Sequence, residues 1–175
     1  AVHAGNVESV EQFRKIGTKL LDEHVLFDVV PDDLVTDELS AEYSQLVSVD
    51  KSDTQTIISN SGYSQFELPY TVRVSATRPA NGNGLAVHLV NYNREEPPRG
   101  RNGKPSGGRG ISDEKPIAVP SSKVRIRLPK GQIVSSVKFL TPESADKKLL
   151  DVRQESQFLQ VTLPKFLVYG VLVIE

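Results

Sequence analysis

The sequence contains no cysteine, no methionine and no tryptophan, and three of its 175 residues are histidines. The absence of cysteine excludes disulfides, thiolate metal sites and cysteine nucleophiles. A gene product normally begins with methionine. Because this chain begins with Ala1 and contains no methionine, we expect a processed chain or a fragment of a larger protein.

Long apolar runs and a strong charge of one sign are missing as well. No apolar stretch approaches the roughly 20 residues that a membrane helix needs, so we expect no membrane partner. The first ten residues have neither the basic start nor the apolar stretch of a signal peptide. The net charge is -1, from 21 basic and 22 acidic residues, which argues against the whole chain as a polyanion binder.

Residues 9–24 carry the one clear helical pattern. Apolar residues recur there at spacings of three and four, which predicts an amphipathic helix. The residues of this stripe are Val10, Phe13, Ile16, Leu20, Leu21 and His24. Ser9 followed by Gln12 fits a capping box at the start of the helix. At its end, a cationic His24 would suit the negative pole of the helix dipole.

Two short apolar runs follow the helix. Residues 25–30 and 43–49 have the composition of buried strands, and residues 32–39 between them are typical of a single helical turn capped by Asp32 or Asp33. The order helix, strand, turn, strand indicates a partial α/β segment, which we assign to residues 1–60.

In residues 61–175 the apolar period changes to two. Alternating runs predict strands at residues 71–76, 85–92, 123–128, 134–140, 157–163 and 166–174. Asn and Gly at positions 81–84 favour a hairpin between the first two. Several short strands without intervening helices predict two antiparallel sheets packed face to face. The fold class is therefore mainly β, an antiparallel β-sandwich preceded by a short α/β segment.

Residues 95–115 contain almost no apolar side chains, so we expect a mobile loop. Its basic residues form a possible polyanion contact: Arg99, Arg101, Lys104 and Arg109. Lys123, Arg125 and Arg127 add a basic strand face. The alternative is a solvated loop and a polar strand face, and the absence of aromatic residues from positions 99–110 argues against nucleic acid.

The sequence shows no catalytic constellation. It has no Gly-x-Ser-x-Gly elbow, and His3 and His88 stand without neighbouring groups that would activate a nucleophile. No His-x-x-x-His or similar ligand spacing occurs, and Asp32 with Asp33 is better explained as a helix cap than as a metal site. We therefore predict no catalytic residue, no metal and no cofactor.

One polar cluster is a candidate ligand site. Tyr92 stands beside Asn91, Asn93 and Arg94 at the end of a predicted strand. Sugar-binding sandwiches commonly stack the ligand on an exposed aromatic ring and hydrogen-bond it with Asn and Arg side chains. The alternative is a strand-ending turn, in which Asn residues occupy their preferred conformations.

The chain resembles the C-terminal region of glycoside-hydrolase-like proteins. Residues 70–76 (YTVRVSA), 85–92 (LAVHLVNY) and 164–171 (PKFLVYGV) look like their appended β-sandwich. Residues 21–30 (LDEHVLFDVV) and 33–34 (DL) are similar to part of a class I glutamine-amidotransferase-like domain. In family-42 β-galactosidases that domain lies between the catalytic barrel and the sandwich and helps trimerisation.

The resemblance implies that the catalytic barrel and its two glutamates lie outside this chain. The amidotransferase-like part is short and has neither the nucleophilic cysteine nor its elbow, so that activity is expected to be lost. The leading hypothesis is a non-catalytic accessory region for domain packing or assembly. The alternatives are a carbohydrate-binding module and a stand-alone hydrolase with an unrecognised acid pair.

The expected partners follow from these hypotheses. They are the catalytic domain of a parent chain, carbohydrate and a second copy of the chain, whereas nucleic acid and membrane are not expected. An extracytoplasmic location is expected if the parent is a secreted glycosidase.

Overall fold

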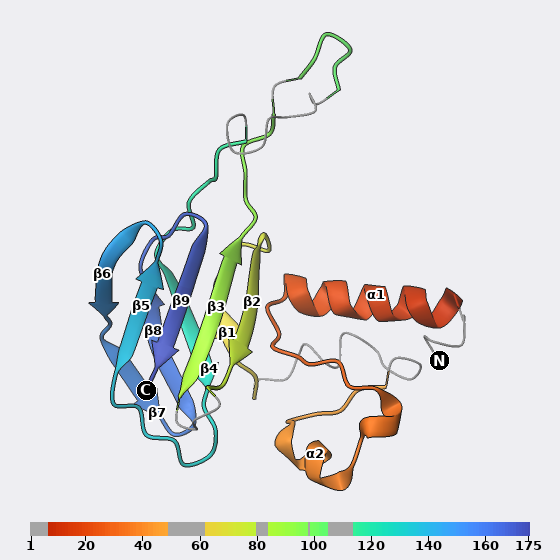
Figure 1. Ribbon diagram of the computed structural model, residues 1–175, viewed down its shortest axis with the longest axis vertical. Coiled ribbons are helices and arrows are strands. Elements are labelled where there is room, and N and C mark those ends of the chain that lie inside the picture. The colour runs from red at the N-terminus through yellow and green to blue at the C-terminus, as the bar shows by residue number, and fades with distance from the viewer. Residues whose placement is uncertain (1–6, 49–61, 80–83, 98, 105–113) are drawn as a thin grey trace.

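The computed structural model describes residues 7–48, 62–79, 84–97, 99–104 and 114–175, and its main feature is a pair of antiparallel sheets (Figure 1). One sheet has four strands in the order β1–β4–β8–β7, and the other has five in the order β2–β3–β9–β5–β6. In chain order the strands are β1 (Gln65–Phe66), β2 (Val72–Thr77), β3 (Leu85–Asn91), β4 (Ser122–Arg127), β5 (Val137–Thr141), β6 (Ser144–Leu149), β7 (Val152–Glu155), β8 (Phe158–Leu163) and β9 (Tyr169–Ile174). The predicted mainly-β sandwich is confirmed.

The core lies between the sheets and is built from one face of each strand. In β4, Val124 and Ile126 are buried while Lys123 is exposed, as the alternating sequence predicts. Further core residues are Val72, Val87, Leu89, Val119, Val137, Phe139, Leu159, Leu163, Phe166, Leu172 and Ile174. Burial of these side chains is the main driving force that holds the sheets together.

Six strands lie where the sequence predicts them, and three others, β1, β6 and β7, were not predicted. β7 is exposed along its whole length and carries Arg153 and Glu155, and β6 carries Asp146 and Lys148. All three strands lie at sheet edges. Charged side chains at an edge discourage pairing with other chains, and they also remove the apolar alternation that marks a strand in a sequence.

The predicted hairpin joins β2 and β3, which pair antiparallel from Val72 opposite Asn91 to Thr77 opposite Ala86. Gly84 has a φ of +152°, a backbone conformation that favours glycine. Residues 81–83 lie outside the described ranges.

The helix α1 (Val7–Asp22) lies beside β2 (Figure 1). Ile16 and Leu20 are its buried apolar residues, as the stripe predicts, and Asp22 Oδ1 accepts a hydrogen bond from Arg73 of β2 at 2.9 Å. The predicted capping box is wrong. Ser9 is the third residue of the helix and therefore cannot be its N-cap. The prediction placed the helix start too late because the apolar pattern begins at Val10, after the first turn has started at Val7.

The two strands predicted in the N-terminal segment are also wrong. Residues 25–30 and 43–48 form no strand. Leu26 packs against the sandwich core, whereas Phe27 and Val29 are exposed, so the first run is a connecting segment. A short apolar run has no clear periodicity, so the sequence does not distinguish a buried strand from an apolar connecting segment.

The predicted helical turn is present as a 3₁₀ helix, η2 (Asp32–Leu34), and its cap position is Pro31 rather than an aspartate. A second helix, α2 (Asp37–Glu42), is capped by Thr36, whose hydroxyl accepts a hydrogen bond from the Leu39 N–H at 3.2 Å. Among the described residues no helix is long and apolar enough to cross a membrane.

Candidate functional site

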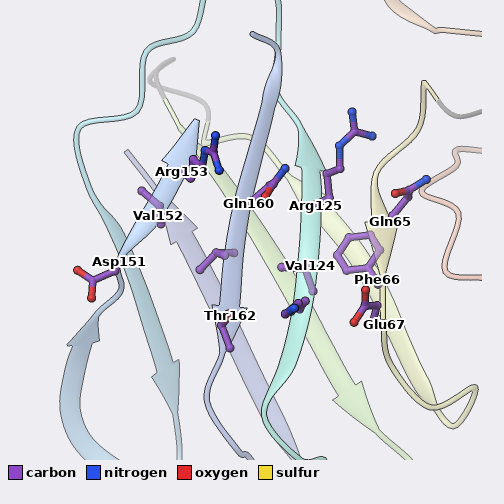
Figure 2. Close-up of a pocket in the computed structure, with 12 residues that line it drawn as sticks. Gln65, Phe66, Glu67, Val124, Arg125, Asp151, Val152, Arg153, Gln160 and Thr162 are labelled. Carbon is purple, nitrogen blue, oxygen red and sulfur yellow. The ribbon is translucent and has the colours of Figure 1, made fainter. Parts of the chain in front are cut away.

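The outer face of the four-stranded sheet carries an open groove of about 790 Å³ (Figure 2). Its floor is formed by the outward-facing side chains of β1, β4, β8 and β7, which alternate with the buried core residues of the same strands. Its lining is mostly polar and charged, and the apolar members are Phe66, Val124, Val152 and Val161.

One row of polar side chains crosses this groove from edge to edge. Strand pairing sets Gln65 of β1 opposite Arg125 of β4, Arg125 opposite Gln160 of β8, and Gln160 opposite Arg153 of β7. Figure 2 shows the four side chains on neighbouring strands. Glutamine amides both donate and accept hydrogen bonds, and guanidinium groups donate several, so the row suits a ligand rich in hydroxyl or carboxylate oxygens.

Contacts with neighbouring side chains orient the cations of this row. The Arg125 guanidinium carbon lies 3.3 Å from the centre of the Phe158 ring. Such a cation–π contact holds the guanidinium plane over the ring and limits its rotamers. Arg153 forms an ion pair with Glu155 at 2.7 Å, and its side chain is 77% exposed, so a ligand can reach it. The floor thus presents one fixed and one accessible guanidinium group.

Two carboxylates stand at opposite ends of the groove. Glu67 follows β1 and Asp151 precedes β7, and Figure 2 shows them on opposite sides. Three strand spacings separate these edges, roughly 14 Å in all. The two acids of a glycosidase lie at most about 9.5 Å apart, so this pair does not have the geometry of glycoside hydrolysis.

The predicted Tyr92 cluster lies at the end of β3, outside this groove. Asn91 is fully buried, and its amide donates to the carbonyls of Ile117 and Leu167 at 2.7 and 2.6 Å. Its Oδ1 accepts the Asn93 N–H at 3.0 Å. Asn91 is therefore a structural residue whose polar atoms are already bonded, and its predicted ligand contact is wrong because the side chain points into the protein.

The other members of that cluster are more accessible. Tyr92 is 63% exposed. The Arg94 guanidinium donates to the carbonyls of Asn91 and Asn93 at 3.0 and 2.7 Å, so it closes the turn after β3. These contacts favour the strand-ending turn for Asn93 and Arg94, which are partly exposed, and Tyr92 is the most exposed residue of the cluster.

The predicted polyanion segment is described in part. Arg99, Arg101 and Lys104 are exposed, and Arg109 lies outside the described residues. The base of the predicted mobile loop is paired, because the Glu95 N–H donates to the Lys115 carbonyl at 2.9 Å and residues 94 and 116 form an isolated bridge. A separate basic face, predicted on β4, lines the groove through Lys123 and Arg125.

The groove residues on the other three strands were not predicted as a site. Each of them occupies a polar, outward-facing position in its strand. Such a position can be recognised in the sequence by alternation with apolar residues, as for Gln160 within residues 158–163. Alternation alone does not tell which strands are neighbours, so it could not assemble the row.

His88, predicted to stand alone, contacts two hydroxyl groups on the outer face of the other sheet. Its Nε2 lies 3.1 Å from Thr77 Oγ1 and its Nδ1 lies 2.6 Å from the Tyr169 hydroxyl. A hydroxyl beside an imidazole can act as a nucleophile with its base. However, β3 pairs on both sides, so its N–H groups are used by the sheet and cannot stabilise an oxyanion. The contacts orient the His88 ring without completing a catalytic site.

His24 is buried where α1 meets the sandwich. It has a φ of +56°, and its Nε2 lies 3.2 Å from the Pro69 carbonyl, to which a neutral Nε2–H donates. Burial lowers the pKa of His24 below its ordinary value of 6.5, although the Pro69 and Val72 backbone and Glu23 oppose this shift, while Arg73 adds to it. The predicted helix-end cation is therefore wrong, because the ring is desolvated.

This burial predicts a pH-dependent stability. In the unfolded chain His24 binds a proton at its ordinary pKa, whereas the folded protein resists protonation. The free energy of unfolding should be fully retained above about pH 6.5 and should decrease as the pH falls below that value towards the folded pKa. Denaturant titrations at about pH 7.5 and about pH 5.5 measure this loss. The His24→Gln variant should lose less stability over this interval, and an equal loss in both proteins would contradict the assignment.

No group of three or more His, Asp or Glu residues that could hold a metal ion is present in the described part of the chain. The His3 side chain lies outside that part.

Solved structures that resemble this chain include two proteins from Paenibacillus. α-L-Fucosidase isoenzyme 2 from Paenibacillus thiaminolyticus has a TM-score of 0.51 and 16% identity over 69% of this chain and 16% of the fucosidase chain. A cycloisomaltooligosaccharide glucanotransferase from Paenibacillus sp., solved with cycloisomaltoheptaose, has a TM-score of 0.46 and 14% identity over 66% and 17% of the respective chains. No protein-family model and no curated protein matches the sequence.

The chain therefore spans about one sixth of the length of each of these neighbours. At this identity the likeness to the fucosidase shows a shared fold and nothing more. The sandwich of this chain has the fold of a part of a glycoside-hydrolase-related protein.

Proposed function

We propose that this chain is a non-catalytic accessory region of a glycoside-hydrolase-like protein and that it binds carbohydrate in the groove of its four-stranded sheet. The observation that carries this proposal is the row of amide and guanidinium groups formed by Gln65, Arg125, Gln160 and Arg153. The chain resembles the fold of a part of a fucosidase that makes up about one sixth of that protein, and this supports the role of an appended region.

The chemistry of the groove is suited to sugar hydroxyl groups. A glutamine amide has donors and an acceptor side by side, which matches the mixed donor and acceptor character of vicinal hydroxyls, and at Gln160 one N–H already donates to Glu155 Oε2 at 3.4 Å. Phe66 provides an aromatic group among the lining residues, and it is partly buried against the core. Binding would depend mainly on hydrogen bonds, with a smaller share from stacking than in sites built on exposed tyrosine or tryptophan.

We expect no hydrolysis of a glycosidic bond in the groove. Glu67 and Asp151 are too far apart to act as an acid and a nucleophile on one glycosidic bond. Of the three hypotheses that the sequence leaves open, the stand-alone hydrolase has the least support from this geometry.

A glycan array tests the proposal. We expect reproducible binding to one class of oligosaccharide, weakened about fivefold in Gln160→Ala, because a neutral hydrogen bond contributes about 1 kcal/mol. Gln12→Ala on the exposed face of α1 is a matched control and should bind as the wild-type chain does. Loss of binding in Tyr92→Ala in place of Gln160→Ala would assign the ligand to the strand-end cluster. A blank array from the folded chain would refute carbohydrate binding.

A second candidate role is domain packing or assembly, which the N-terminal segment favours. Its exposed apolar side chains include Phe27, Val29, Leu34, Val35 and Leu46. We propose that the parent chain or a second copy covers these residues, as the resemblance to the trimerising region of family-42 β-galactosidases implies. Sedimentation equilibrium tests whether two copies of the chain associate through these residues. A chain that stays monomeric at high concentration would refute the second copy and leave the parent chain as the proposed partner.

A further inference from the structure

We infer that the outer face of the five-stranded sheet is an interaction surface on which a second copy of this chain packs. This interaction is separate from carbohydrate binding in the groove. It also concerns a surface other than the exposed apolar residues of the N-terminal segment. The evidence is the composition of this face and the way in which its polar groups are bonded.

The outer face of the five-stranded sheet is apolar at its centre. Strand pairing sets Val171 of the central strand β9 between His88 of β3 and Leu140 of β5. Residues 169–174 (YGVLVI) contain no charged side chain and no alternation with polar residues, which is typical of a strand covered on both faces. The apolar and aromatic side chains of the outer face belong to Val90, Leu140, Leu149, Tyr169, Val171 and Val173.

The outer face of the four-stranded sheet shows the usual alternative. Its interior strands have polar side chains at the outward positions, such as Arg125 on β4 and Gln160 on β8, as expected for a sheet with one solvated face. The five-stranded sheet departs from this rule, although none of the helices in the described part of the chain lies over β3, β9 and β5 (Figure 1). A contiguous apolar patch without a cover marks an interaction surface.

The one imidazole on this face is already bonded within the face. His88 Nδ1 lies 2.6 Å from the Tyr169 hydroxyl, and Nε2 lies 3.1 Å from Thr77 Oγ1. Both ring nitrogens therefore have partners, and a covering surface would leave neither of them buried without a hydrogen bond. A ligand rich in hydroxyl groups would find no free ring nitrogen here, so the face suits an apolar protein surface.

The cations of this face on β2 and β5 are paired as well. Arg73 lies 2.9 Å from Asp22 Oδ1, and Lys138 lies 2.5 Å from Glu175 Oε2. In a twofold dimer the same patch meets itself, so an unpaired charge on the patch would be brought close to its own copy. The pairing of Arg73 and Lys138 removes this repulsion, and the face is therefore compatible with a second copy of itself.

The shape and size of the face also fit a second copy. Twisted sheets pack face to face about 10 Å apart, and a twofold axis parallel to the sheet above Val171 places β9 of one protomer on β9 of its partner. Four strand spacings and about five residues per strand give a face of roughly 19 by 17 Å, on the order of a few hundred Å². Each partner in a stable complex contributes about 800 Å², so we expect a weak and reversible dimer.

Sedimentation velocity of the whole chain over a concentration series tests the inference. We expect a monomer–dimer equilibrium with a dissociation constant on the order of micromolar or weaker. Val171→Lys should weaken dimerisation about tenfold or more, because it places an unpaired ammonium group of each copy in the interface. Val171 is partly exposed, so the lysine can reach solvent in the monomer. Val171→Thr keeps the β-branched shape and should weaken dimerisation by a smaller factor.

A matched control places the same charge elsewhere. Ile133 is 86% exposed and lies in the loop before β5, where Gln154 of β7 bonds the Gln132 carbonyl at 2.8 Å and the Val134 N–H at 3.1 Å. Ile133→Lys also replaces an exposed β-branched residue with lysine, but outside the sheet face. It should leave the dissociation constant of the dimer unchanged.

Three outcomes would overturn the inference. A chain that stays monomeric at every concentration would refute the second copy and leave another part of the parent protein as the cover of this face. A dimer that persists in Val171→Lys would place the contact elsewhere, and its loss in Val29→Lys would assign the contact to the N-terminal segment. A loss of dimerisation in Ile133→Lys equal to that in Val171→Lys would show unspecific association. The glycan array tests carbohydrate binding independently of all three.

Discussion

Replacing Gly170 with alanine should destabilise the sandwich by about 3 kcal/mol or more, because the added methyl group has no space. Gly170 lies in β9, and a Cβ placed there would be 2.5 Å from Cζ and 2.9 Å from Cε2 of Phe139. Phe139 is buried and packs against Phe166 with ring centroids 5.9 Å apart, so its ring cannot move aside without disturbing the centre of the core. Urea denaturation measures the loss.

A second glycine provides the matched control. A Cβ at Gly17 in α1 would meet nothing within 4 Å, so Gly17→Ala should leave the stability unchanged or raise it by up to about 1 kcal/mol. If the clash is the cause, the double variant Gly170→Ala with Phe139→Leu should lose less than the sum of the two single losses. A Gly170→Ala protein as stable as the wild-type chain would contradict this account of the core.

Replacing Asn91 with alanine should cost about 2 to 4 kcal/mol, since it leaves buried backbone groups without partners. The side chain joins the end of β3 to the segments that contain Ile117 and Leu167, through hydrogen bonds of 2.7 and 2.6 Å. It also accepts the Asn93 N–H at 3.0 Å. The free energy of unfolding from urea titration is the measurement.

Two further variants separate hydrogen bonding from shape at this position. Asn91→Asp preserves the size but places a carboxylate against two carbonyl oxygens, so it should be at least as destabilising as alanine at neutral pH. Asn93→Ala keeps the backbone N–H that Asn91 accepts and should have a small effect. A stable Asn91→Ala protein would show that these hydrogen bonds contribute little.

The sandwich could be predicted because its central strands carry their pattern locally. The alternation of Lys123, Arg125 and Arg127 with Val124 and Ile126 marks β4 from the sequence alone, and the structure buries the apolar set as expected. The edge strands β6 and β7 could not be found in this way, because their exposed side chains contain no apolar alternation.

The groove could not be predicted because it depends on strand order. Gln65, Arg125, Gln160 and Arg153 are far apart in the sequence or on separate strands, and they become neighbours only through pairing. The ligand site predicted from the sequence contained Asn91 and Tyr92, which are adjacent in the chain. Since successive residues of a strand point to opposite faces, their adjacency placed one side chain in the core and the other in solvent.

NMR chemical-shift mapping shows whether the outer face of the four-stranded sheet binds carbohydrate. The titrant is the oligosaccharide with the strongest signal on the glycan array. We expect saturable shifts confined to residues 65–67, 123–125, 151–153 and 160–162. Shifts centred on residues 92–94 or 99–104, or no shift at any accessible concentration, would contradict it.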